Sequence, residues 1–187
     1  MKLNKLIAIA TISLLSGGIS MAQKALNLED IVAGNIIQTK GIGSMTWLKD
    51  GERYSRLENN KQTGGTDIVA YRAKDNSREV IIPSSLLTDK STGRPIPVRS
   101  VSWSADNEKV LIYNNTRRVW RYDTRGDYWV LNLKDGALRQ LGKGMPESSM
   151  MFAKFSPDGT RVAYVSNNNI YVEDIDSGKI TQLTKDG

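Results

Sequence analysis

The chain has 187 residues, of which 25% are charged and 39% are hydrophobic. This length and composition predict a soluble globular domain with a sizeable core. The sequence contains no cysteine and no histidine. Their absence excludes disulfides, thiolate or histidine-ligated zinc, a cysteine nucleophile and an ordinary Ser-His-Asp triad. We therefore expect no catalytic residue, no metal and no cofactor, and no catalysis by this chain alone.

Basic residues outnumber acidic ones by 26 to 20, which gives a net charge of +6. The basic residues are scattered along the chain, whereas a nucleic-acid interface needs them clustered on one face. We expect no nucleic-acid partner.

The N-terminus has the parts of an export signal. Lys2 and Lys5 form a positive start, Leu6 to Leu15 is apolar, and Ser20-Met21-Ala22 supplies small residues at the −3 and −1 positions of a cleavage site. We predict that residues 1–22 are a signal peptide and that the mature chain, 23–187, is periplasmic or secreted. No other segment approaches the roughly 20 apolar residues that span a bilayer, so we expect no membrane span after cleavage.

After this segment, the residues from Leu26 to Ala33 have spacing suited to one or two helical turns, with Asn27 as N-cap and Gly34 as terminator. From Ser44 onward, short alternating runs are separated by Asp-Gly, Asn and Lys-Asp-Gly turns. This pattern is typical of strands and hairpins.

An internal repeat organises these strands. Residues 101–110 (VSWSADNEKV) align with 153–162 (AKFSPDGTRV) at an offset of 52, and 128–133 align with 170–175 at an offset of 42. A weaker third copy begins at Trp47. Each copy contains four short strands, and radial repetition of four-stranded units is typical of a β-propeller, whereas a β-sandwich would not repeat the same phrase. We predict an all-β fold, an incomplete β-propeller of about three four-stranded blades preceded by a signal peptide and a short helix.

The number of blades bears on domain organisation. A closed propeller typically needs four to eight blades, so we expect 23–187 to be the N-terminal part of a larger propeller domain.

The change of offset places ten extra residues between the second and third strands of the middle unit, within 114–125. A blade needs only a tight turn there, and an insertion rich in arginine and aromatic residues favours a binding loop. A solvated extension of the hairpin is the alternative.

The inserted segment resembles a known family. Val119-Trp120-Arg121-Tyr122-Asp123-Thr124, running into 127–131 (DYWVL), is similar to the Gln-Trp-Arg-His-Ser-Tyr phrase of the dipeptidyl peptidase IV family. The similarity continues in register through 155–165 (FSPDGTRVAYV) and 167–172 (NNNIYV). It covers essentially everything after the predicted signal peptide.

The resemblance implies a function for the whole protein. The family removes Xaa-Pro or Xaa-Ala dipeptides from peptides with a free N-terminus, using a propeller joined to an α/β-hydrolase domain. Arg121 matches the family arginine that contacts the carbonyl of the substrate residue next to the cleaved one, and Trp120 looks like its packing support. Tyr122 departs from the family's usual histidine. We expect a homodimer for the full-length enzyme.

Two other motifs of the family do not occur in this sequence. They are the Glu-Glu pair that holds the α-ammonium of the substrate and the nucleophile motif Gly-x-Ser-x-Gly. The resemblance therefore implies a propeller fragment of an exported serine dipeptidyl peptidase. The alternative is a non-catalytic binding propeller in the periplasm, similar to that of the TolB translocation protein. Arg125-Gly126-Asp127 spells an integrin-binding tripeptide, but it lies at the mouth of a predicted strand and is interpreted as a coincidence.

Exported protein should begin at Gln23, because the predicted cleavage follows Ala22. N-terminal sequencing or intact-mass spectrometry of secreted material checks this prediction. Recovery of exported protein that still carries Met1 would show that the segment is not cleaved.

Overall fold

The computed structural model describes residues 27–32, 41 and 43–187. The predicted signal peptide lies outside the described residues. The chain divides into two units, Met1–Gly41 and Ile42–Gly187. In the first unit, the short helix α2 spans Leu28–Val32, within the segment expected to be helical. In the described part of the chain, no helix is long and apolar enough to cross a membrane.

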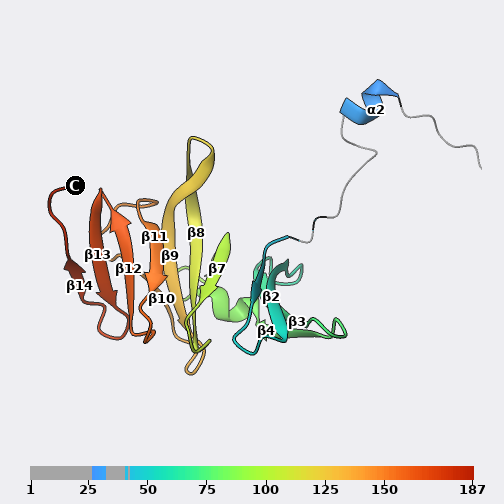
Figure 1. The fold of residues 1–187 in the computed structure, drawn as a ribbon, viewed down its shortest axis with the longest axis horizontal. Helices are drawn as coiled ribbons and strands as arrows, with labels where there is room; N and C mark the ends of the chain where they lie inside the picture. Colours follow the sequence, from blue (N-terminus) through green and yellow to red (C-terminus); the bar gives the residue numbers. More distant parts are fainter. Residues whose placement is uncertain (1–26, 33–40, 42) are drawn as a thin grey trace, which may run out of the picture. The chain divides into compact units, whose positions relative to one another are not determined.

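The second unit consists of three successive four-stranded antiparallel sheets and a two-stranded hairpin (Figure 1). The first sheet contains β1 (Met45–Trp47), β2 (Arg53–Asn59), β3 (Thr66–Arg72) and β4 (Arg78–Ile82). The 3-10 helix η1 (Ser84–Leu87) and the hairpin of β5 (Thr88–Asp89) and β6 (Arg94–Pro95) follow. The middle sheet contains β7 (Ser100–Trp103), β8 (Lys109–Val119), β9 (Tyr122–Asn132) and β10 (Leu138–Gln140). The last sheet contains β11 (Met151–Phe155), β12 (Arg161–Ser166), β13 (Asn169–Asp174) and β14 (Ile180–Gln182).

Each sheet is a meander in which strands adjacent in sequence are hydrogen-bonded neighbours. The three sheets correspond to the three copies of the sequence repeat, including the weak copy that begins at Trp47. The prediction of an all-β fold with about three four-stranded blades is therefore confirmed.

The repeated turn between the first two strands forms as its sequence predicts. In the last sheet, the Asp158 carboxylate accepts hydrogen bonds from the Ser156 hydroxyl at 2.6 Å and the Thr160 amide at 3.0 Å, and Gly159 has φ 67°. The Ser156 hydroxyl is the largest of the influences that lower the pKa of Asp158 to about 2. In the middle sheet, Asn107 takes the place of this glycine with φ 60°, a conformation that asparagine tolerates better than most residues.

Two hydrophobic clusters hold the sheets face to face. Val110 and Ile112 of β8 belong to the cluster shared with the first sheet, whereas Leu111, between them, belongs to the cluster shared with the last sheet. Successive side chains of a strand point to opposite faces, so β8 is apolar on both sides. All three side chains are at most 2% exposed, and burial of each contributes roughly 1.5–3 kcal/mol.

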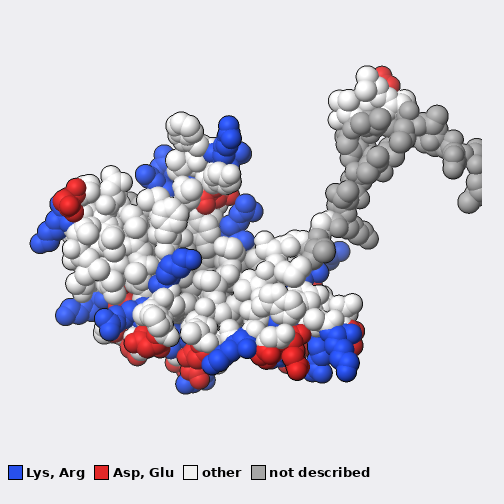
Figure 2. All heavy atoms as spheres, in the orientation of Figure 1, with Lys and Arg blue, Asp and Glu red and all other residues white. Residues whose placement is uncertain are grey.

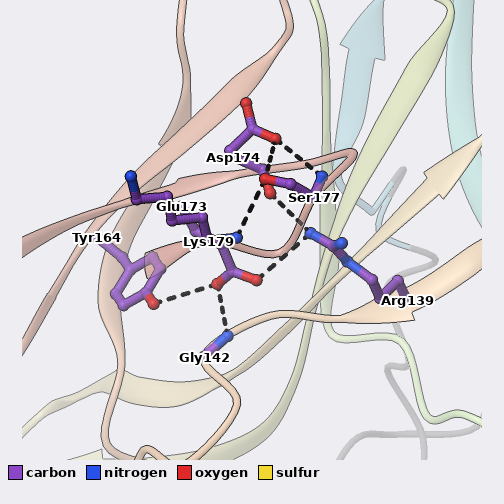
Figure 3. A network of polar contacts seen from close by, with 7 residues as sticks. All are labelled: Arg139, Gly142, Tyr164, Glu173, Asp174, Ser177 and Lys179. Atoms are coloured by element: carbon purple, nitrogen blue, oxygen red, sulfur yellow. Dashed lines mark hydrogen bonds and ion pairs between the residues drawn. The ribbon is translucent and has the colours of Figure 1, made fainter. Parts of the chain in front are cut away.

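Between the middle and last sheets, a buried carboxylate joins the two (Figure 3). Glu173 of β13 is 2% exposed and accepts hydrogen bonds from the Gly142 amide at 2.8 Å and the Tyr164 hydroxyl at 3.2 Å. Arg139 of β10 lies 3.4 Å from the other carboxylate oxygen and also donates to the Asp174 carbonyl at 3.0 Å. Burial, and then the charge of Glu173, raise the pKa of Tyr164, so its hydroxyl keeps the proton that it donates.

Replacing Glu173 with alanine should lower the free energy of unfolding by roughly 3 kcal/mol, because buried donors and a cation lose their acceptor. Urea unfolding followed by tryptophan fluorescence measures this loss. Glu108 is a matched control, because it pairs with Lys134 at 2.7 Å on the surface. Glu108→Ala should cost less than about 1 kcal/mol. Equal effects of the two substitutions would refute a special role for the buried carboxylate.

Candidate functional site

The middle sheet carries a projecting hairpin made of the extended ends of β8 and β9 (Figure 1). Each of these strands has 11 residues, whereas β7 has four and β10 has three. Pairing of β7 with β8 reaches only Tyr113, and pairing of β10 with β9 reaches only Trp129. We call residues 115–126, which extend past these neighbours, the arm.

The arm contains the inserted residues that the sequence comparison located. They continue the two strands as an extended hairpin and do not form an irregular loop. The binding role expected for this segment stays a prediction. Its tip is a two-residue turn of Trp120 and Arg121, closed by the Val119–Tyr122 pair. Trp120 has φ 61°. Two-residue hairpin turns need such left-handed backbone, which glycine usually supplies, so a tryptophan there is strained.

The structure places both predicted site residues at the tip. The Arg121 side chain is exposed, and Trp120 is 94% exposed. The indole therefore packs against almost nothing in the described part of the chain. Instead, the Arg118 guanidinium contacts the turn, because its Nε donates to the Trp120 carbonyl at 3.2 Å.

The arm is strongly basic. Its charged residues are four arginines and one aspartate: Arg117, Arg118, Arg121, Asp123 and Arg125. Figure 2 shows arginine atoms beside uncharged atoms at the end of the arm. Arg117 and Arg125 are direct cross-strand partners, and like charges in that position are destabilising. This composition suits an electron-rich ligand, such as a carbonyl or a carboxylate.

Contacts of Asp123 hold the arm to residues of the middle sheet and to the residue that precedes it. The Asp123 carboxylate lies 3.2 Å from the Arg99 guanidinium, and its backbone carbonyl accepts from the Tyr113 hydroxyl at 3.0 Å. The Tyr113 ring stacks on Tyr128, with centroids 4.8 Å apart. Burial raises the pKa of Tyr113 to about 12, so this hydroxyl remains a donor at neutral pH.

The alignment of the internal repeats did not identify the residues at the base of the arm. Gly126 and Asp127 are buried, so the Arg-Gly-Asp tripeptide is not displayed on an open loop. A side chain at Gly126 would overlap the Tyr113 ring and the Asn114 carbonyl. The sequence offers one indication of this base, an aspartate directly before the apolar run 128–131. In the described residues, no group of three or more histidine, cysteine, aspartate or glutamate side chains could hold a metal ion.

Three consecutive four-stranded meanders, packed face to face, define this chain as part of a β-propeller. The resemblance to the dipeptidyl peptidase IV family that the sequence predicted is confirmed by comparison with known proteins. Residues 104–187 match the sequence model of the dipeptidyl peptidase IV N-terminal region. This stretch includes the whole arm and the last sheet.

Similar proteins agree with this assignment. A probable dipeptidyl-aminopeptidase B from Aspergillus terreus is 26% identical over 181 residues, which cover 92% of this chain and 20% of that protein. The homologue from Chaetomium globosum is 32% identical over 87 residues, or 46% of this chain and 9% of that protein. The crystal structure of dipeptidyl peptidase 4 from Porphyromonas gingivalis superposes with a TM-score of 0.66 at 24% identity. That superposition covers 88% of this chain and 22% of the other, and it shows the shared fold. The matched region thus spans about a fifth of the length of the Aspergillus terreus and Porphyromonas gingivalis proteins.

Proposed function

We propose that this chain is part of the substrate-binding propeller of an exported serine dipeptidyl peptidase. That enzyme would release N-terminal Xaa-Pro or Xaa-Ala dipeptides from peptides with a free N-terminus. One observation carries the proposal: Arg121 lies exposed at the tip of a basic arm, inside the region that matches the family.

The role proposed for Arg121 follows from its chemistry. A guanidinium presents five donors in a rigid planar fork, which can hold a backbone carbonyl and fix the register of a peptide. At a tight turn, the backbone of this residue is held by the paired strands on both sides. Arg121 would bind the carbonyl of the substrate residue next to the cleaved one.

The proposal assigns the chemistry of cleavage to another part of the full-length enzyme. The sequence has no histidine, so the general base of a Ser-His-Asp triad would come from elsewhere. The propeller would admit the peptide and help to bind it. Export through residues 1–22, a periplasmic or secreted location and a homodimeric full-length enzyme are parts of the same proposal.

In the full-length enzyme, Arg121→Ala should lower kcat/KM for a Gly-Pro chromogenic substrate by about ten- to a hundredfold. A hydrogen bond to a charged donor contributes about 1.5–3 kcal/mol, and each tenfold corresponds to about 1.4 kcal/mol. Arg121→Lys should recover only part of this loss, because an ammonium lacks the planar fork. Steady-state kinetics of the purified variants give these values.

Arg117→Ala is the matched control, because Arg117 lies on the same arm and its side chain forms no hydrogen bond or ion pair with any described residue. Arg118 is unsuitable as a control, since it contacts the carbonyl of Trp120. Unchanged kinetics for Arg121→Ala, together with a large loss for Arg117→Ala, would show that the proposed alignment of this segment is wrong.

The 187-residue chain alone should release no product from the same substrate. Incubation of purified chain at micromolar concentration, compared with a buffer blank, tests this expectation. Activity that co-purifies with the chain through successive columns would contradict the assignment of catalysis to another part of the enzyme.

A further inference from the structure

A cluster of polar contacts holds the base of the arm. The Asp127 side chain of β9, 6% exposed, accepts from the Ser148 amide at 2.8 Å and from the Asn115 side-chain amide at 2.7 Å. The same Asn115 amide nitrogen lies 2.7 Å from a carboxylate oxygen of Glu147, and the Ser148 hydroxyl donates to the Asn115 carbonyl at 2.6 Å. We call these four residues the arm clamp. They join both strands of the arm to the segment that leads into the last sheet.

The clamp coincides with a change in the direction of β8. The β8–β9 register shifts between Asn114 and Arg117, which marks a β-bulge, and Asn115 has φ 43°. A bulge bends its strand and redirects the side chains near it. Regular alternation would place Asn115 on the face opposite Asn114, which is the partner of Asp127. The bulge instead brings the Asn115 amide to Asp127.

A second contact lies directly beside the clamp. Gly126 and Met150 exchange two backbone hydrogen bonds of 3.0 and 3.1 Å. Met150 is 2% exposed in the cluster shared with the last sheet. The base of the arm is therefore attached to the packed part of the molecule, while the tip is free of it.

The hydrogen bonds of the clamp favour positioning over cation binding. Two acidic side chains meet there, and the buried Asn114 side-chain oxygen has no hydrogen-bond partner. However, the Asn115 amide already donates between the two carboxylates, and the Ser148 amide donates to Asp127. The negative charge is satisfied by donors within the chain.

We propose that Asn115 and Asp127 are the positioning pair that aims Arg121 at the substrate. This inference rests on the function proposed above for Arg121. Arg121 is six residues from each member of the pair, or roughly 20 Å along an extended strand. A tilt of about 10° at the clamp would then move the tip by roughly 3 Å. A misplacement of about 1 Å can already cost a hundredfold in rate.

The test removes the hydrogen bond from Asn115 to Asp127 with one variant and restores it, with donor and acceptor exchanged, in a second variant. Asn115→Asp keeps the size of the side chain and its tolerance of left-handed backbone, but it replaces the donor by a third carboxylate. In the full-length enzyme, this variant should lower kcat/KM by about tenfold or more. The double variant N115D/D127N supplies a donor from the other side and leaves the Ser148 amide an acceptor oxygen. It should recover to within about threefold of the parent enzyme.

A positioning role also predicts that the effects are not additive. If Asn115 acts only through Arg121, N115D should change kcat/KM by less than about twofold in an enzyme that already carries R121A. A general structural defect would lower both backgrounds equally. Limited trypsin digestion of the 187-residue chain provides a reading without catalysis, because cleavage after Arg121 should be several times faster in N115D and normal again in N115D/D127N.

The outcomes separate the two proposals. Full activity of R121A would refute the proposed function of Arg121, and the positioning role with it. Two results would refute the positioning role alone. In the first, R121A lowers kcat/KM but N115D does not. In the second, N115D lowers kcat/KM equally in the parent enzyme and in R121A. If N115D does not fold, D127N measured against R121A/D127N answers the same question. Failure of N115D/D127N to regain activity while it regains trypsin resistance would also refute the positioning role.

Discussion

The middle sheet needs a neighbouring sheet on each of its faces, because β8 presents apolar side chains at successive positions. Val110 and Ile112 pack toward the first sheet, and Leu111 packs toward the last. A strand that is apolar on one face only could leave its other face in water, but this one cannot. The face-to-face stacking of blades follows from that pattern. The buried Glu173 adds directional contacts to it. A carboxylate shielded from water must find donors at fixed places, and here they are Tyr164 of its own sheet together with Arg139 and Gly142 from the side of the middle sheet.

The same packing frees the arm to project. The neighbouring strands β7 and β10 pair with β8 and β9 only as far as Tyr113 and Trp129. Past the contacts of Gly126 and Asp127 at its base, the arm has no neighbouring strand among the described residues. An isolated two-stranded hairpin is at best marginally stable in water. The hydrogen bond from Tyr113 to the Asp123 backbone and the clamp at Asp127 supply what neighbouring strands supply elsewhere in the sheet. The arm can thus extend outward while its base stays fixed.

Much of this architecture was predictable from the sequence. The repeat gave the three blades, the Ser-Pro-Asp-Gly phrase gave the turn at Asp158, and the unequal offsets located the arm. The conformation of the arm was harder to predict, because inserted residues can continue two strands or form a loop with little difference in composition. The bulge at Asn115 and the burial of Asp127 depend on contacts with Ser148, which lies more than twenty residues away in sequence. A local sequence pattern cannot predict contacts between residues so far apart. The exposure of Trp120 was equally hidden, because an aromatic residue beside an arginine suggests packing.

Two features of the arm are costly in stability. Trp120 has left-handed backbone that disfavours a bulky side chain, and two arginines face each other across the strands. Folding alone would favour glycine in the turn and opposite charges in the pair. Sequences depart from such local preferences mainly at sites that serve a function, where the rest of the structure compensates for the strain. Here the compensation comes from the clamp around the buried Asp127 and from the packed sheets. It permits an exposed, basic tip whose side chains the fold itself does not require.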